Sequence, residues 1–153
     1  MGLKMTGISI TDFARKVEII MPEIMRGFAR RQHSDIFKGK ITLPQLLILD
    51  ILNSQGASKM TDLAKKMKVT TAASTGIVQR LVVQGYVLRE YDEKDRRLII
   101  IKLSPKGSDV LKKINQQRTQ LITRIFSQIS EDDRAEYLRI LMQVKDILDK
   151  EES

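Results

Sequence analysis

The chain of 153 residues contains no cysteine and a single histidine, His33. Without cysteine it cannot form disulfides, thiolate zinc sites or thiol redox sensors. One histidine cannot supply the pair of imidazoles that many transition-metal sites use. The sequence also lacks a glycine-rich phosphate loop and a pair of acids with a defined partner. We therefore expect no enzyme, no metal site and no cofactor.

Long hydrophobic runs are absent as well. No apolar stretch reaches the roughly 18–20 residues that a bilayer-spanning helix needs. The first residues, MGLKMTGISITDF, lack the apolar core of a signal peptide. We expect a cytoplasmic protein without a membrane partner. At 42% hydrophobic residues, the chain has enough apolar surface to bury a core.

Basic residues outnumber acidic ones mainly in the middle of the chain. The net charge is +8 at pH 7, of which residues 56–107 contribute +6. Residues 1–55 contribute +3 and residues 108–153 contribute −1. Such an asymmetry is expected when one face of a protein meets a polyanion.

Apolar residues at three- and four-residue spacing predict long helices near both ends of the chain. The first covers residues 10–37 and is expected to kink where Pro22 removes a backbone donor. Another covers 105–128 after the N-cap Ser104, and a last one follows Ser130. Their apolar stripes are too long for a monomer of this size, so we expect a partner subunit to cover them.

Shorter helices are predicted between these long ones. Thr42 and Gln45 have the spacing of a capping box, and they begin a helix that ends at the sequence NSQG. A short extended segment then leads to Thr61, which we expect to cap the next helix. After a break at 69–70, a further helix runs over 71–84 before a glycine stops it.

Two extended runs, VLREY and LIIIKL, flank six consecutive charged residues, 92–97. The turn between them has no glycine and is rich in long cations. An arginine held by an aspartate keeps a defined direction, so we expect Asp95 to brace Arg97. The predicted order is α-α-β-α-α-β-β-α-α, a mainly α chain. Two short helices in series followed by a hairpin are the layout of a winged helix-turn-helix.

The same residues resemble the MarR family of bacterial and archaeal transcription regulators. The resemblance lies in TLPQLLILDIL, MTDLAKKM and IVQRLVVQGYVLREYDEKDRRLIIIKLSPKG, together with the long helices on either side. The family's Asp-x-Arg wing signature falls on Asp95 and Arg97. Its closing Leu-Thr-x-x-Gly appears as Leu103, Ser104 and Gly107, and serine keeps the capping hydroxyl.

The resemblance implies a homodimer that binds double-stranded DNA. Residues 1–38 and 108–153 would form the helical dimerisation region, and residues 39–107 the winged helix-turn-helix domain. The function implied is a sequence-specific transcriptional regulator, most simply a repressor, on a pseudo-palindromic operator. A winged-helix protein–protein adaptor and a non-specific nucleic-acid-binding protein stay open as alternatives.

Carried onto this sequence, the recognition helix is 71–84. Residues 70–79 carry no charge, which suits adenine edges and thymine methyls better than guanine-rich sites. The DNA-binding residues that we expect are Thr71, Ala72, Thr75, Gly76, Gln79 and Arg80 on this helix, Lys65 and Lys66 before it, and Lys94, Asp95, Arg96 and Arg97 on the wing.

A small-molecule effector is a further implication of the resemblance. The first helix carries Met21, Met25 and Phe28 beside Arg26 and Arg30, which could line an apolar cavity with a cationic rim. Such a cavity would favour a small aromatic or anionic ligand. The alternative is that these apolar residues close the dimer core and the arginines are solvated.

Overall fold

The computed structural model describes residues 7–31 and 40–151. His33 and the expected end of the first helix, 32–39, lie outside these residues. The chain divides into two compact units, with the boundary after Gln117.

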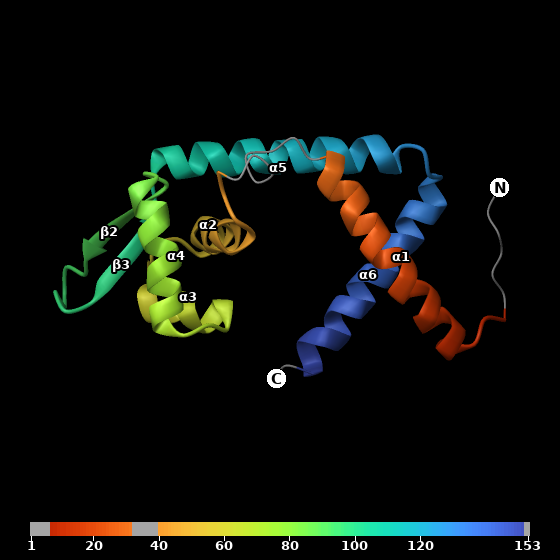
Figure 1. Ribbon diagram of the computed structural model, residues 1–153, viewed down its shortest axis with the longest axis horizontal. Helices are drawn as coiled ribbons and strands as arrows, with labels where there is room; N and C mark the ends of the chain where they lie inside the picture. The colour runs from red at the N-terminus through yellow and green to blue at the C-terminus, as the bar shows by residue number, and fades with distance from the viewer. Residues whose placement is uncertain (1–6, 32–39, 152–153) are drawn as a thin grey trace. The chain divides into compact units, whose positions relative to one another are not determined.

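The described residues form a mainly helical chain with one small antiparallel sheet, as the sequence predicted (Figure 1). The order of the elements is also the predicted one. They are α1 (Ile10–Arg31), α2 (Leu43–Gln55), β1 (Ser58–Lys59), α3 (Met60–Met67), α4 (Thr71–Val83), β2 (Val87–Tyr91), β3 (Ile99–Leu103), α5 (Pro105–Phe126) and α6 (Glu131–Glu151).

Helix α2 begins with the capping box that the sequence predicted. The Thr42 hydroxyl accepts from the backbone N–H of Gln45 at 3.4 Å, and the Gln45 Oε1 accepts from the Thr42 N–H at 2.8 Å. The helix ends at Gly56, whose φ of 78° lies in the region that favours glycine. Both ends of α2 are therefore fixed by local sequence.

The start of α3 differs from the prediction. The helix begins at Met60, and its N-cap is Lys59 rather than Thr61. Lys59 still belongs to β1, where it pairs with Ile100. Met60 is buried in the core, so the strand passes directly into the helix. Sheet pairing and burial thus override the capping preference of Thr61.

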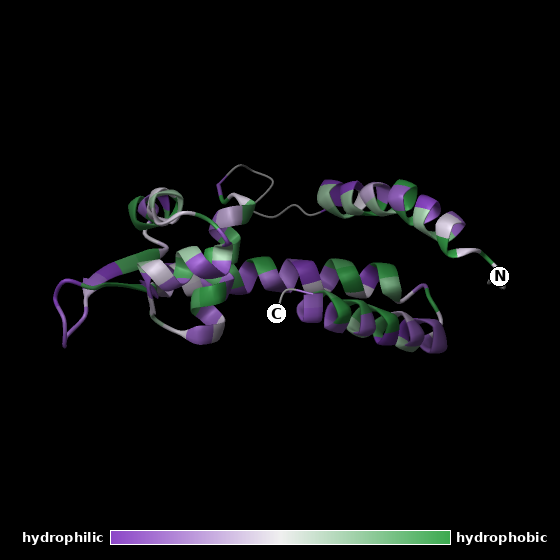
Figure 2. Cartoon of the chain, turned by 90° about the horizontal axis from the view of Figure 1, so that it is seen from below, coloured by the Kyte–Doolittle hydropathy of each residue, from purple (hydrophilic) through white to green (hydrophobic). Residues whose placement is uncertain are grey.

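The sheet has the order β1-β3-β2, with both pairs antiparallel. Ile101, in the middle strand, pairs with Ser58 on one side and Arg89 on the other and is fully buried. The tip of the β2–β3 hairpin projects away from α2, α3 and α4 in both ribbon views, and Figure 2 shows that it is strongly hydrophilic. This hairpin is the wing.

The core of the first unit lies where α2, α3, α4 and the beginning of α5 meet the sheet. The central residues are aliphatic, and nearly all are less than 3% exposed. The cluster consists of Ile41, Leu46, Ile48, Leu49, Leu52, Met60, Leu63, Val78, Leu81, Val87, Ile101, Leu111 and Ile114. This cluster fixes α4 and the base of the wing relative to one another.

The long helices α1 and α6 leave large apolar side chains exposed. Helix α1 continues past Pro22 to Arg31, so the proline does not interrupt it. On α6, Leu138 and Ile147 are each 58% exposed. Figure 2 shows apolar and polar residues on both helices. Among the described residues, no helix is both long and apolar enough to cross a membrane.

Candidate nucleic-acid interface

Helix α4 has one face fixed in the core and the other open to solvent. Ser74, Val78 and Leu81 are fully buried, and Ile77 is half-buried against the core. Val78, Leu81 and Ile77 thus form the inner face of α4. The six outward residues named from the sequence are all exposed: Thr71, Ala72, Thr75, Gly76, Gln79 and Arg80.

The first turn of α4 is capped by a residue that the sequence analysis did not single out. The Thr70 hydroxyl accepts from the backbone N–H of Ala73 at 3.1 Å. Lys68, two residues before Thr70, is the C-cap of α3 and has a left-handed backbone with a φ of 53°. One turn further along, the Thr75 hydroxyl donates to the Thr71 carbonyl at 2.8 Å. The Thr75 oxygen therefore keeps its acceptor capacity for an outside donor.

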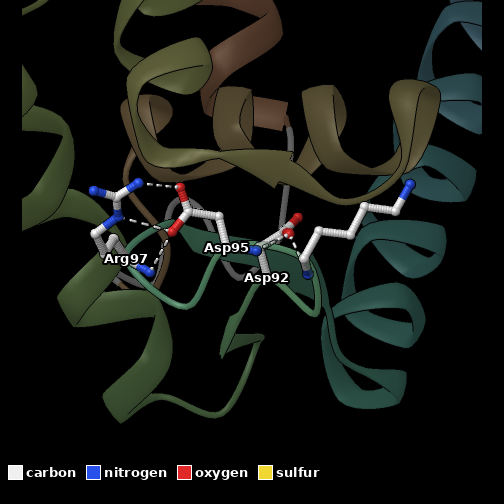
Figure 3. A network of polar contacts seen from close by, with 4 residues as sticks. Asp92, Asp95 and Arg97 are labelled. Atoms are coloured by element: carbon white, nitrogen blue, oxygen red, sulfur yellow. Dashed lines mark hydrogen bonds and ion pairs between the residues drawn. The ribbon is translucent and has the colours of Figure 1, made fainter.

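The tip of the wing contains the expected brace between Asp95 and Arg97 (Figure 3). The Arg97 Nε donates to Asp95 Oδ1 at 3.0 Å, and its Nη2 donates to Oδ2 at 3.2 Å. The Arg97 backbone N–H also donates to Oδ1, at 3.1 Å. The Arg97 side chain is 91% exposed and that of Asp95 is 37% exposed. A two-point contact thus fixes a guanidinium that no core packing holds.

The charge on Asp95 is stabilised by the same contacts. The side-chain hydrogen bonds from Arg97 lower the pKa of Asp95 below its ordinary value of 3.8, and the backbone N–H of Arg97 adds to this effect. The carboxylate is therefore fully ionised at physiological pH. Protonation of Asp95 therefore does not break the ion pair with Arg97 near neutral pH.

Asp92 explains how the turn forms without glycine. Its Oδ1 accepts from the backbone N–H groups of Lys94 at 2.8 Å and of Asp95 at 3.0 Å, as in an Asx-turn (Figure 3). The backbone N–H of Asp92 in turn donates to the Leu98 carbonyl at 3.0 Å. This role was not predicted from the sequence, although aspartate at the start of a turn is its usual signal.

The base of the wing is tied to the end of α4 by Ser104. Its hydroxyl donates to the Gly85 carbonyl at 2.6 Å and accepts from the backbone N–H of Gly107 at 2.9 Å. This confirms that serine supplies the capping hydroxyl at the start of α5. The contact also links the residues after the recognition helix directly to α5.

The remaining cations lie on exposed surfaces of the same unit. Lys65 and Lys66 of α3 are exposed and line a groove of about 410 Å³ with Lys59 and Asp62. A second groove of about 410 Å³ includes Gln79 and Arg80 of α4 together with Lys40, Thr42, Gln45, Val83 and Gln84. The structure thus places Gln79 and Arg80 together in this groove, with Lys65 and Lys66 in a different one.

The five residues named for an effector all lie on α1. Met21 is 47% exposed, Met25 is 65% exposed and Phe28 is half-buried. Arg26 and Arg30 are exposed. Among residues 7–31 and 40–151, no group of three or more histidine, cysteine or acidic side chains could hold a metal ion.

Comparison with known proteins identifies the family. Residues 41–99 match the MarR family. The chain is 32% identical to a protein whose crystal structure is described as a MepR like protein complexed with pseudoligands. The match covers 88% of this chain and 94% of that one, with a TM-score of 0.56. The protein belongs to the MarR family.

Other solved structures share the fold of this MarR-family protein. A MarR family protein from Bacillus stearothermophilus has a TM-score of 0.78 at 20% identity, over 92% of this chain and 99% of that one. BpsR from Bordetella bronchiseptica has a TM-score of 0.63 at 21% identity, over 85% and 98%. Its structure is described as a mechanism for regulation of DNA binding by 6-hydroxynicotinic acid.

Among curated relatives is the HTH-type transcriptional repressor MdtR from Bacillus subtilis. It is 25% identical over 75% of this chain and 74% of its own length. The family and this relative are transcriptional regulators rather than enzymes. The MarR-family protein is accordingly a helix-turn-helix transcriptional regulator.

Proposed function

We propose that this MarR-family protein is a homodimeric, sequence-specific DNA-binding repressor located in the cytoplasm. In this proposal α4 enters the major groove, and the wing contacts the DNA backbone or the adjacent minor groove. The observation that carries the proposal is the Asp95–Arg97 brace at the wing tip. A highly exposed two-point ion pair adds little to stability. It does hold a cation in a fixed direction for an outside anion.

The outer face of α4 supports direct reading of bases. Thr71, Thr75 and Gln79 offer hydroxyl and amide groups, and Ala72 and Gly76 leave room for close approach. Such side chains pair with adenine edges and contact thymine methyls. Arg80 at the end of this face, with Lys65 and Lys66 of α3, would contact phosphates and set the register. On the wing, Lys94 and Arg96 would add phosphate contacts beside Arg97.

The proposed dimer would use residues 1–38 and 108–153, leaving residues 39–107 for DNA. The exposed apolar side chains of α1 and α6 support this division, because a partner subunit would remove them from water. A two-fold axis would then present two recognition helices to half-sites one helical turn, ~34 Å, apart. This spacing predicts a pseudo-palindromic operator.

We further propose repression that a small aromatic or anionic ligand relieves. MdtR is named a repressor, and the DNA binding of BpsR is regulated by an aromatic acid. In this chain the ligand would bind at Met21, Met25 and Phe28, with Arg26 and Arg30 at the rim. It could act only by favouring a separation of the recognition helices that does not fit DNA.

The test begins with selection of bound duplexes from a random pool. We expect a pseudo-palindrome to emerge, and binding to it should fall steeply with salt as counterions are released. Sedimentation at micromolar concentration should give a dimer. Equal affinity for operator and random duplex would favour a non-specific nucleic-acid-binding protein. A lack of DNA affinity even at low salt would favour a protein–protein adaptor.

A further inference from the structure

The two ends of the recognition helix are held in different ways. Its beginning is capped locally by Thr70, whereas its C-cap residue, Gln84, contacts residues far away in the sequence. The Gln84 Nε2 donates to the backbone carbonyl of Lys40 at 2.8 Å. Its Oε1 accepts from the Nε2 of Gln45 at 3.2 Å. These partners are 44 and 39 positions distant in the chain.

The backbone groups at the two ends of this hydrogen-bond network fix the orientation of both side-chain amides. The backbone N–H of Thr42 can only donate, so Gln45 must turn its oxygen toward it, at 2.8 Å. This places the Gln45 nitrogen toward Gln84, whose side-chain oxygen must therefore accept the hydrogen bond. The Gln84 nitrogen then faces the Lys40 carbonyl, which can only accept. Neither amide can flip without leaving two contacts unsatisfied.

Burial makes this arrangement stiff. Gln45 is only 3% exposed, so its polar groups have little access to water as an alternative partner. The same side chain closes the capping box of α2. A shift of α4 at Gln84 therefore disturbs the beginning of α2 as well.

A third contact joins Gln84 to α5. The Lys106 Nζ donates to the backbone carbonyl of Gln84 at 2.7 Å. The same ammonium lies 5.0 Å from the centre of the Tyr86 ring, within cation–π range. Lys106 belongs to the first turn of α5, which continues beyond Gln117 into the second unit. Lys40 precedes α2, on the side of the chain that comes from α1.

Gln84 lies next to the residues proposed to read DNA. Gln79 and Arg80 are about one helical turn before it. They line the same groove of about 410 Å³ with Lys40 and Gln45. Any change in the direction of the end of α4 therefore changes where Gln79 and Arg80 point.

We propose that Gln84 is a positioning residue for DNA recognition. Its side chain and its carbonyl fasten the end of α4 to the two chain segments that lead to α1 and along α5. A displacement of either segment reaches the recognition helix through this residue. The inference rests on the proposed DNA-binding function. It adds to that function a residue that connects the recognition helix α4 to the segment before α2 and to α5.

The principal test is Gln84→Met, which keeps the side-chain length and removes both amide contacts. Affinity is measured for the operator selected with the parent protein and for random duplex at low salt. We expect operator affinity to fall about tenfold while random-duplex affinity stays unchanged, a typical size for coupling between sites. Gln116→Met is the matched control, because Gln116 is an exposed glutamine of α5 outside residues 39–107, and it should leave both affinities unchanged.

Gln84→Glu disrupts the contact with Lys40 and keeps the one with Gln45. It keeps an oxygen for Gln45 but sets a carboxylate against the Lys40 carbonyl, so we expect the same selective loss of operator affinity. Lys106→Met should lower the operator-to-random ratio in the same direction, and its effect should not add fully to that of Gln84→Met. This third variant keeps the test available if Gln84→Met does not fold.

Two results would overturn the inference. One is operator affinity unchanged in the folded Gln84 variants. The other is an equal loss on operator and random duplex that follows the melting temperature, which would indicate a purely structural role. A parent protein without preference for the operator would instead defeat the proposed function, and this is seen before any variant is made.

Discussion

The backbone carbonyl of Tyr86 occupies the space that a side chain on Gly107 would need. A Cβ at position 107 would lie 1.9 Å from the Tyr86 oxygen and 2.9 Å from its carbonyl carbon. The same oxygen accepts from the backbone N–H of Ser104 at 3.0 Å. It therefore cannot move away without breaking the link between the end of α4 and the start of α5.

Gly107→Ala should consequently destabilise the protein by about 3 kcal/mol or more, since backbone has to shift at a packed junction. Denaturant unfolding measures the change. Gly76→Ala is the matched control, because nothing lies within 4 Å of the Cβ at that exposed helical position. It should raise stability by up to about 1 kcal/mol through helix propensity. A Gly107→Ala protein as stable as the parent would contradict the close approach.

Arg97→Ala should weaken operator binding without changing the melting temperature. The side chain is 91% exposed and packs on nothing in the core, so its loss leaves the fold intact. If Arg97 contacts a phosphate, the slope of the logarithm of the binding constant against the logarithm of salt concentration should become shallower by about one in Arg97→Ala. Arg139→Ala is the control, because Arg139 makes a similar two-point contact with Glu136 on α6. Parent-like binding by Arg97→Ala at physiological salt would remove the wing from the interface.

The carboxyl of Asp95 should titrate below its ordinary pKa of 3.8. A pKa that is lower in the folded protein than in the unfolded chain stabilises the fold above the unfolded value. That contribution disappears as the pH falls through the folded value, so the brace is insensitive to pH near neutrality. Carbon-detected NMR titration measures the midpoint, and Arg97→Ala should return it toward 3.8. An unchanged midpoint in that variant would show that Arg97 is not the cause.

Gln79→Ala should change which sequences are preferred rather than abolish binding. If the amide contacts an adenine edge through two hydrogen bonds, its loss costs about 1–3 kcal/mol at that base pair. Selection from a random pool with the variant and with the parent shows whether one position in each half-site relaxes. Gln116→Ala, at an exposed glutamine on α5, should select the parent's sequence. An unchanged preference in Gln79→Ala would exclude this residue from base reading.

An aromatic acid such as salicylate should release DNA and raise the melting temperature if the α1 residues bind a ligand. A ligand that binds only the folded state stabilises it by mass action. Met25→Ala and Arg30→Ala should weaken the ligand's effect on both readouts while DNA binding without ligand persists. If a panel of aromatic acids at millimolar concentration changes neither readout, the ligand site is lost and the DNA-binding dimer is unaffected.

The sequence was most informative where structure depends on neighbouring residues. The Thr42–Gln45 capping box, the Ser104 cap and the Asp95–Arg97 pair all join residues within three positions of one another. Each such pattern carries its own chemical signal. The family resemblance likewise named six outward residues on the recognition helix, and all six are exposed.

Contacts between distant residues were not foreseen. The link between Gln84 and Gln45 has no local signal, because the capping box accounts for Gln45 without Gln84, and Gln84 alone resembles a solvated helical position. The prediction of Thr61 as the N-cap of α3 was wrong for a related reason. Lys59 is held in the sheet by Ile100, which lies far along the chain, and the helix begins directly after it. Tertiary pairing of this kind overrides local preference and is visible only once the fold is known.

The two-residue strand β1 gives the domain its cooperativity. It precedes α3 and α4 in the sequence, yet it pairs with β3, which is also one strand of the wing hairpin. Closing this pair requires both helices to be formed and packed between its partners, so the entropy of a long loop is lost in one step. Amide hydrogens of Ile100 and Ile101 should therefore exchange only through global opening of the domain. We therefore expect the wing and the recognition helix to form and melt together.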